Sequence, residues 1–431
     1  MTAGLLAVVP IVDGPEEGPR RRGEGRDSMG TTGWMGRPGY WREATMSELS
    51  RRGFLGSATL AAGAAGAVAA GSEPEYDGHE KGGGELPSFR FALEESKGGH
   101  RTEGGSARQA TIKELPVSKG LAGVSMRLHP GGIRELHWHA IAAEWAFVLE
   151  GRVRTTVIAP DGASEMNDFE AGEVWYFPRG HGHMLQGLGP GDAHFILIFD
   201  DGAFSEFGTF SVTDWLHHTP PEVLAKSMGL PASAFAKFPK KEVYIAQGQI
   251  PPEDPPRMHQ GGQKLTSATH RYPLLAQEPH SRFAGGEERR VSAREFPIST
   301  TMTGVVLDLK PGGLREPHWH PNADEWQYII RGKARIGVFG SEGRARAEEF
   351  KVGDVGYVPR GYGHFVENIG EEPLRVLIGF NSGDYQEISL STWLAANPDA
   401  VLADNFQIPE ELVARLPRRR VFIASKDGPG A

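Results

Sequence analysis

The 431-residue chain contains no cysteine. That absence excludes disulfides, thiolate metal ligands and cysteine nucleophiles. Positive charge is also scarce, because 46 Lys and Arg stand against 55 Asp and Glu and the formal net charge is −9. A chain without a basic field does not neutralise a phosphate backbone, so we expect no nucleic-acid partner. Metal or acid–base chemistry must therefore use the carboxylates and the 16 histidines.

Long hydrophobic runs are missing as well. The Ala/Gly-rich run from Ala58 to Ala70 is about half of the roughly 20 residues that a membrane-spanning helix needs. We therefore expect no stable membrane span. The run follows Arg51 and Arg52 and contains the small-residue triplet at 67–69, an order typical of a cleavable export signal.

Residues 46–72 resemble a twin-arginine signal peptide, which predicts export to the periplasm, the cell envelope or the outside. The plainer alternative is a chance arginine pair before a low-complexity linker. Residues 1–45 are rich in Gly and Arg and have no periodicity. We expect them to be a mis-assigned start or a disordered extension, with translation beginning at Met46.

The rest of the chain contains one sequence unit that occurs twice. Residues 89–199 align with residues 270–380 without an insertion, at a constant offset of 181. A proline-rich stretch from Ile250 to Arg257 separates the copies and is typical of a linker. We predict a first domain at 86–245, a linker at 246–265 and a second domain at 266–425.

Each copy has the pattern of short strands. In the first copy, apolar or alternating runs are separated by Gly, Pro and Asp turns and occupy 124–128, 146–150, 155–159, 174–178 and 195–199. Many short strands at even spacing predict an all-β sandwich or barrel with a few short helices. We expect helices to follow N-caps at Thr219 and Asn397, each with proline at the first helical position.

Histidines and glutamates recur at matched positions in both copies. Alternation along a strand points both histidines of each His-Trp-His triplet to one face. A hairpin could bring a third histidine over that face, and a glutamate follows the triplet. Three imidazoles and one carboxylate predict a metal site with open coordination positions, although isolated histidines usually have ordinary surface or core roles. The two sets are His137, His139, Glu144 and His183, and His318, His320, Glu325 and His364.

These residues lie in G-x(5)-H-W-H-x(4)-E-x(6)-G and G-x(5)-P-x-G-x(2)-H, which resemble the two cupin motifs. With R-E-x-H-W-H in both copies and F-D-D-G-A-F-S-E in the first, the chain resembles the bicupin oxalate decarboxylases. That resemblance implies two cupin (double-stranded β-helix, jelly-roll) barrels in tandem. It also implies two Mn²⁺ per chain, dioxygen as redox partner, oxalate as the dicarboxylate substrate, and a homo-oligomer, commonly a trimer or hexamer.

Arg134 and Arg315 each precede the first histidine of a triplet by three residues. Strand alternation places them on the face opposite the metal ligands, in an outer salt bridge, unless the glycine-rich approach bends the chain. The resemblance instead places them beside the substrate, where a guanidinium binds a carboxylate. We adopt the second interpretation.

The copies differ after their last matched strand, where the first copy has three extra residues around Glu206. In the resembled enzymes this stretch is a lid whose glutamate transfers the proton, a role that falls on Glu206. The lid here is S-E-F-G-T, where the family usually has S-E-N-S-T. This departure bears on lid closure and on the balance between decarboxylation and oxidation.

The second copy has Ile378 where some relatives carry another glutamate. We therefore assign turnover to the first domain and a structural or auxiliary role to the second. The resemblance predicts Mn-dependent conversion of oxalate to formate and carbon dioxide. The alternatives are an oxalate oxidase that produces hydrogen peroxide, a non-catalytic metal-binding bicupin, and another small-acid dioxygenase or isomerase on the same fold.

Overall fold

The computed structural model describes residues 84–97, 99–253 and 268–429. The predicted signal at 46–72, residues 1–45 and positions 254–265 of the predicted linker lie outside these ranges. Among the described residues, no helix is long and apolar enough to cross a membrane. Strands dominate the described chain, and the named strands pair into four sheets.

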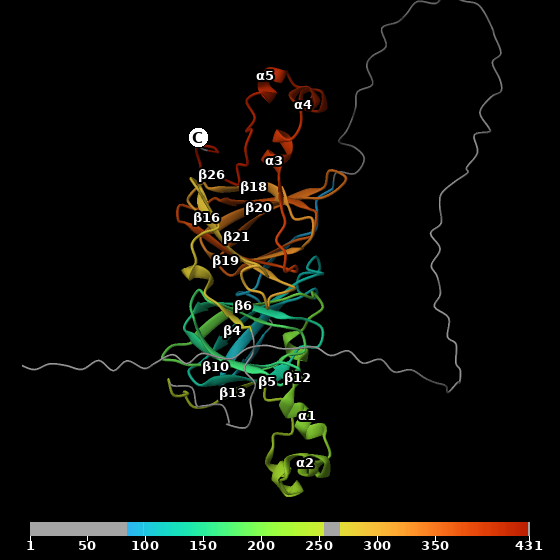
Figure 1. Ribbon diagram of the computed structural model, residues 1–431, viewed down its shortest axis with the longest axis vertical. Helices are drawn as coiled ribbons and strands as arrows, with labels where there is room; N and C mark the ends of the chain where they lie inside the picture. The colour runs from blue at the N-terminus through green and yellow to red at the C-terminus, as the bar shows by residue number, and fades with distance from the viewer. Residues whose placement is uncertain (1–83, 98, 254–267, 430–431) are drawn as a thin grey trace, which may run out of the picture. The chain divides into compact units, whose positions relative to one another are not determined.

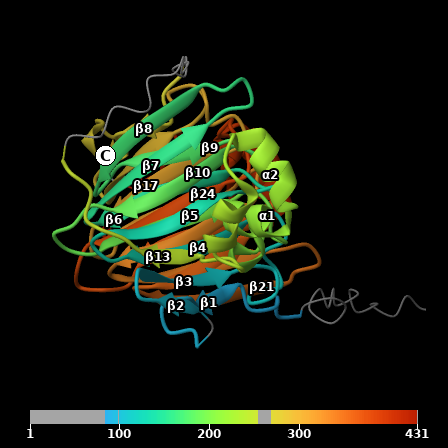
Figure 2. The ribbon, with the colours of Figure 1, turned by 90° about the horizontal axis from the view of Figure 1, so that it is seen from below.

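The first barrel consists of two antiparallel sheets (Figure 1). Sheet 1a contains β5 (Gly132–Trp138), β7 (Arg152–Ile158), β8 (Ser164–Glu170), β10 (Gly182–Gly187), β12 (Phe210–Ser211) and β13 (Ile245–Gln247). Figure 2 shows β5, β10, β7 and β8 of this sheet running side by side. Sheet 1b contains β2 (His100–Thr102), β3 (Gly105–Ala110), β4 (Ala122–Leu128), β6 (Glu144–Glu150), β9 (Val174–Phe177), β11 (Ala193–Phe199) and β14 (Arg271–Tyr272).

The second barrel repeats this arrangement. Sheet 2a contains β18 (Leu314–Trp319), β20 (Lys333–Phe339), β21 (Ala345–Lys351), β23 (Gly363–Asn368), β25 (Ile388–Ser389) and β26 (Ile423–Ala424). Sheet 2b contains β1 (Arg90–Ala92), β15 (Ser281–Phe283), β16 (Gly286–Val291), β17 (Thr303–Leu309), β19 (Glu325–Arg331), β22 (Asp354–Val358) and β24 (Leu374–Phe380). The predicted fold class, all-β with tandem barrels and short helices, is confirmed.

Short helices follow the last long strand of each repeat. They are η1 (Glu206–Gly208), α1 (Val212–His218), α2 (Pro221–Met228) and η2 (Ala232–Lys237) in the first, and α3 (Leu390–Ala395), α4 (Asp399–Phe406) and α5 (Glu410–Val413) in the second; η3 (Leu274–Ala276) follows β14. The predicted N-caps at Thr219 and Asn397 are wrong by one residue, because Pro220 and Pro398 cap α2 and α4. Pro220 precedes another proline, which disfavours the helical conformation for it.

The two repeats exchange one strand each. Strand β1 belongs to the first repeat but pairs with β22 of the second barrel. Strand β14 belongs to the second repeat but pairs with β9 of the first barrel. Each seven-stranded sheet therefore contains one strand from the other repeat, and the exchange ties the two barrels together through main-chain hydrogen bonds.

A shared hydrophobic core lies between the barrels, besides the core inside each one. Trp145 and Trp326, the residues after Glu144 and Glu325, are fully buried in this shared core. Each indole contacts a glycine of the other repeat: a Cβ built on Gly123 would lie 2.0 Å from Cζ2 of Trp326, and one on Gly304 would lie 2.0 Å from Cζ2 of Trp145. The tryptophan beside each carboxylate ligand thus anchors the opposite barrel.

We expect Gly123→Ala and Gly304→Ala to destabilise the protein, because the added methyl group would overlap a tryptophan held in a close-packed core. The free energy of unfolding should fall by at least about 1–3 kcal/mol, measured by denaturant titration at constant metal loading. Gly191→Ala is the control, because a Cβ there meets no atom within 4 Å. Equal stability of the three variants would show that the close packing of Trp326 on Gly123 and of Trp145 on Gly304 contributes little to the free energy of unfolding.

Candidate metal centres and their surroundings

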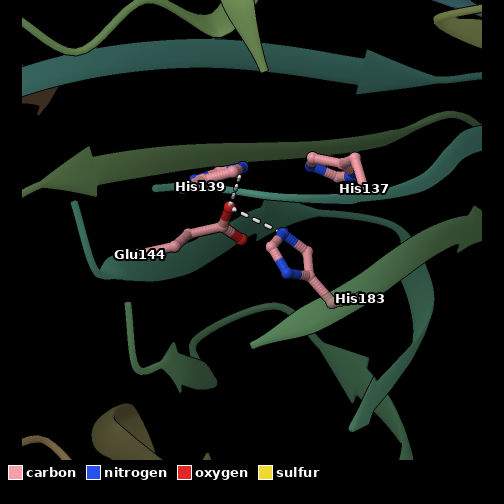
Figure 3. A group of neighbouring side chains, drawn as sticks. All are labelled: His137, His139, Glu144 and His183. Atoms are coloured by element: carbon pink, nitrogen blue, oxygen red, sulfur yellow. Dashed lines mark ion pairs between the residues drawn. The ribbon is translucent and has the colours of Figure 1, made fainter. Parts of the chain in front are cut away.

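The first predicted ligand set comes together inside the first barrel. His137 lies on β5, His139 just after it, Glu144 at the start of β6 and His183 on β10. One ligand atom from each residue lies within 4.8 Å of all the others. All four side chains are buried and converge on one point (Figure 3). The Oε2 atom of Glu144 lies 3.8 Å from Nε2 of His139 and 3.4 Å from Nε2 of His183.

The second set comes together in the same way in the second barrel, and its side chains are also buried. The Oε2 atom of Glu325 lies 3.0 Å from Nε2 of both His320 and His364. His318 completes the group from β18. Within the described residues, these two sets are the groups that could hold a metal ion.

Strand register explains the convergence. Strands β5 and β10 are antiparallel, and His183 lies directly opposite His137. His364 lies opposite His318 in the same way. Trp138, between the two histidines of its triplet, contacts Phe210 and Trp215 instead. The alternation that the sequence predicts therefore places His137 and His139 together, away from the indole between them.

The imidazoles are prepared for metal binding. Nδ1 of His137 lies 2.6 Å from the Glu135 carbonyl oxygen and Nδ1 of His318 lies 2.7 Å from that of Glu316. A carbonyl only accepts hydrogen bonds, so Nδ1 carries the proton and the Nε2 lone pair is left for a metal. Burial lowers the pKa of both rings well below the usual value and keeps them neutral. The Nε2 atoms of His139 and His183 are buried and have no hydrogen-bond partner among the described residues. A bound metal ion would coordinate their lone pairs.

The two carboxylate ligands are held by different neighbours. Trp175 Nε1 donates to Glu144 Oε1 at 2.7 Å, whereas Gln327 Nε2 donates to Glu325 Oε1 at 2.5 Å. In each barrel a large side chain lies opposite a small residue on the paired strand: Trp175 opposite Ala146 in the first, and Gln327 opposite Gly356 in the second. The large residue is therefore on a different strand in each barrel. The sequence analysis did not single out these donors. The sequence does contain a sign of them, because Ala146 matches Gln327 and Trp175 matches Gly356 at the offset of 181.

Both arginines lie on the metal side of their strands, contrary to simple alternation. Four residues of β5, from Arg134 to His137, lie opposite three residues of β10, and β18 has the same irregularity between Arg315 and His318. Such a bulge adds one residue and turns the next side chain to the other face. Arg134 is 0% exposed and Arg315 is 2% exposed. The outer salt bridge that alternation predicts is therefore wrong.

Glu206 lies on the short helix η1 and is buried. Its Oε1 accepts a hydrogen bond from Nε of Arg134 at 2.8 Å, and Nη2 of Arg134 donates to Thr209 Oγ1 at 2.8 Å. Glu206 Oε2 and Arg134 Nη1 are buried without partners among the described residues. Burial raises the pKa of Glu206, although the neighbouring guanidinium opposes the shift. The pair thus offers one free donor and one free carboxylate oxygen.

Aromatic contacts hold η1 against the barrel. The ring of Phe207 stacks on His100 at 4.4 Å and contacts Tyr244 edge-on at 5.9 Å. The Tyr244 ring also lies under the guanidinium of Arg134, with 4.5 Å between the ring centroid and Cζ. Phe207, at the position where the resembled family usually has asparagine, therefore makes aromatic contacts. Tyr244 was missed because it lies far from every matched motif.

The fold and the two centres define a two-domain cupin. The family model described as Cupin matches residues 92–234 and 272–414. Over 344 residues the chain is 41% identical to oxalate decarboxylase OxdC of Bacillus subtilis, covering 80% of this chain and 88% of that protein. It is 35% identical to a probable oxalate decarboxylase of Arthroderma benhamiae, covering 82% of this chain and 86% of that protein.

A solved structure of the B. subtilis oxalate decarboxylase, from work on its Mn(II) centres, superimposes with a TM-score of 0.75. That structure is 40% identical in sequence and covers 80% of this chain and 91% of its own. The chain belongs to the bicupin oxalate decarboxylase family.

The different donors predict separable metal affinities. Trp175→Phe should weaken metal binding at the first centre by about 10–100-fold and leave the second unchanged, because it removes the hydrogen bond that orients Glu144. Gln327→Leu should have the converse effect at the second centre. Competition with a chelator, followed by elemental analysis, measures both sites. Equal weakening of both sites by either variant would contradict the assignment.

Proposed function

We propose that the protein converts oxalate to formate and carbon dioxide at a manganese centre, with dioxygen as redox partner. The observation that carries this proposal is the buried Arg134–Glu206 pair beside a His₃Glu site. The relatives named as oxalate decarboxylases support the choice of substrate. The free Nη1 of Arg134 suits a carboxylate group of oxalate, because charge-assisted hydrogen bonds to carboxylates are strong.

Glu206 serves as the proton-transfer residue in the first barrel. Decarboxylation needs a base that accepts the carboxyl proton of hydrogen oxalate and an acid that returns it to the carbon after the C–C bond breaks. Burial raises the pKa of Glu206, which lets one group hold the proton between these steps. Its Oε2 accepts no hydrogen bond from a described residue, and burial together with Glu206 raises the pKa of the neighbouring Tyr244 hydroxyl, which therefore keeps its own proton.

The two His₃Glu sets would hold manganese, which together with dioxygen would supply one-electron chemistry to the reaction. The neutral imidazoles and the carboxylate fit such an ion. Divalent copper and zinc bind sites of this type more tightly than manganese does. Selection of manganese therefore depends on where the protein acquires its metal.

The proton-transfer role predicts the behaviour of Glu206→Gln when the first centre is observed alone. In a His320→Ala background, which weakens the second centre, Glu206→Gln should lower formate production about 10²–10⁴-fold because the proton carrier is lost. Metal bound at the first centre should stay the same. Glu222→Gln, at an exposed glutamate of α2, is the control. Full activity of Glu206→Gln would refute the role.

The segment 205–209, the lid in this proposal, affects the balance between decarboxylation and the competing oxidase reaction. An oxidase would convert oxalate and dioxygen to hydrogen peroxide and two molecules of carbon dioxide. The stacking of Phe207 on His100 supports the decarboxylase, because it holds Glu206 beside Arg134 where it can return a proton. Gly208, next along the chain, is exposed.

Association of several copies is part of the proposal, as a homo-oligomer with the trimer or hexamer as the expected form. An apolar groove on sheet 2a supports it. Trp319, Phe365 and Leu390 line the groove, together with Phe339 and Trp393, which are more than half exposed. Exposed apolar surfaces of this kind mark association sites.

Export by the twin-arginine route would explain how the protein acquires manganese instead of zinc or copper. That route carries folded proteins, so manganese could be bound in the cytoplasm and trapped before export. Replacement of both Arg51 and Arg52 by lysine should retain the protein in the cytoplasm of its native host, measured by cell fractionation. Export of that variant at the normal level, or mainly zinc in active native protein, would contradict this account.

A further inference from the structure

A second buried glutamate lies beside the second metal centre, and the mechanism above does not use it. Glu288 on β16 is 2% exposed. It lines a small cavity together with the ligands His318, His320 and Glu325 and with Arg315. A carboxyl group with almost no access to water therefore faces the space beside the second centre.

Glu288 is poorly compensated. Its Oε1 has no hydrogen-bond partner among the described residues, and the closest ion pair is with Nη1 of Arg290 at 3.5 Å. The Arg290 guanidinium also lies over the ring of Tyr385, 4.3 Å from its centroid. Burial raises the pKa of Glu288 to about 7, although the charges of Arg315, Arg290 and Arg420 oppose the shift and Glu387 adds to it. Its burial and its free Oε1 therefore favour the protonated form of Glu288 more than water favours that of an exposed glutamate.

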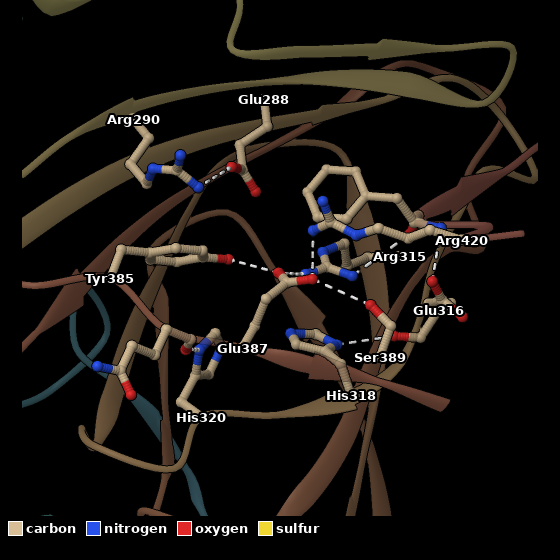
Figure 4. A network of polar contacts seen from close by, with 12 residues as sticks. Glu288, Arg290, Arg315, Glu316, His318, His320, Tyr385, Glu387, Ser389 and Arg420 are labelled. Atoms are coloured by element: carbon tan, nitrogen blue, oxygen red, sulfur yellow. Dashed lines mark hydrogen bonds and ion pairs between the residues drawn. The ribbon is translucent and has the colours of Figure 1, made fainter. Parts of the chain in front are cut away.

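Glu387, a further carboxylate in this region, accepts hydrogen bonds from several neighbours (Figure 4). Arg315 and Arg420 both donate hydrogen bonds to it. The Tyr385 hydroxyl donates at 2.8 Å and the Ser389 hydroxyl at 3.0 Å. Despite burial, these partners hold the pKa of Glu387 at about 2. Glu387 therefore stays ionised and is a poor proton carrier.

The two barrels thus differ in which element contributes the buried glutamate that has an unpartnered carboxylate oxygen. Glu206 and Glu387 share the offset of 181, but Glu206 has one arginine partner and Glu387 has two. The position that matches Glu288 in the first barrel is Ala107. Each barrel therefore contains a buried glutamate near its ligands that has one carboxylate oxygen without a hydrogen-bond partner among the described residues: Glu206 of η1 in the first and Glu288 of β16 in the second. Glu135 in the first barrel also has a free Oε2, but its Oε1 accepts a hydrogen bond from the Tyr244 N–H.

We propose that Glu288 is the proton-transfer residue of the second metal centre, and that the second barrel turns over oxalate itself. This inference rests on the proposed function. In the balanced reaction, hydrogen oxalate gives carbon dioxide and formate: the C–C bond breaks, a C–H bond forms, and the carboxyl proton passes through Glu288 to the carbon. No oxidant is consumed overall.

This assignment replaces the auxiliary role that the sequence predicts for the second domain. That expectation rested on the absence of a carboxylate at Ile378. Ile378 lines the same cavity as Glu288, so a carboxyl group from β16 enters the space that β24 leaves apolar. Arg315, also at the cavity, is the second centre's counterpart of Arg134.

The test isolates each centre in the full-length, manganese-loaded protein. His139→Ala, and separately Glu206→Gln in case the first variant folds poorly, should leave formate production by the second centre. Adding Glu288→Gln to either background should lower that production by about 10²-fold or more. Glu287→Gln is the matched control, because Glu287 is the neighbour on β16 and pairs with Arg282 and Arg289 instead.

Two further measurements do not depend on turnover at the first centre. Metal-free protein should show an infrared absorption of a protonated carboxyl group that disappears as the pH rises through about 7. Glu288→Gln should lack it, and Glu287→Gln should retain it. In the Glu206→Gln background, Ile378→Glu should restore formate production to Glu288→Val, because it returns a carboxyl group to the same cavity.

The outcomes separate this inference from the proposed function. If His320→Ala protein produces formate and neither His139→Ala nor Glu206→Gln protein does, the inference is overturned and the proposed function stands. Equal formate production with and without Glu288→Gln in the isolated second centre also overturns it. If no variant and no wild-type protein produces formate, the proposed function itself fails.

Discussion

The site in each barrel depends on one irregularity in strand pairing. Arginine and histidine three residues apart on a regular strand would face opposite sides of the sheet. Because Arg134 to His137 and Arg315 to His318 each include one residue more than the paired strand, both side chains face the metal side. The bulge therefore places a permanent positive charge beside neutral imidazoles in a buried space. The buried carboxyl groups nearby follow from that charge, since a buried guanidinium needs a partner.

The close hydrogen bonds and ion pairs of each carboxyl group set its protonation, rather than the number of arginines around it. Glu206 has one buried arginine and a raised pKa. Glu387 has two arginine partners and two hydroxyl donors, and its pKa is about 2. Glu288 lies 3.5 Å from its one ion-pair partner, and burial dominates. The two barrels thus differ in which glutamate has a raised pKa, whereas their eight metal-ligand candidates occupy matched positions.

Much of this structure could be predicted from residue patterns. The strands at 124–128 and 195–199 fall within β4 and β11, and alternation with the repeat brought the ligands together because both depend on local geometry. The exchange of β1 and β14 could not be predicted, because identical copies give no signal for pairing within or between repeats. Glu288 was missed for a related reason: matched positions were compared, and only one copy has a carboxylate there.

The central claim is that a proton held on a buried glutamate returns to carbon, so that oxalate ends as formate. The most direct measurement is the product stoichiometry of the wild-type, manganese-loaded protein on oxalate, with formate, carbon dioxide and hydrogen peroxide measured together. The account predicts one formate and one carbon dioxide for each oxalate consumed, without stoichiometric peroxide. Peroxide and two carbon dioxide for each oxalate, without formate, would contradict it.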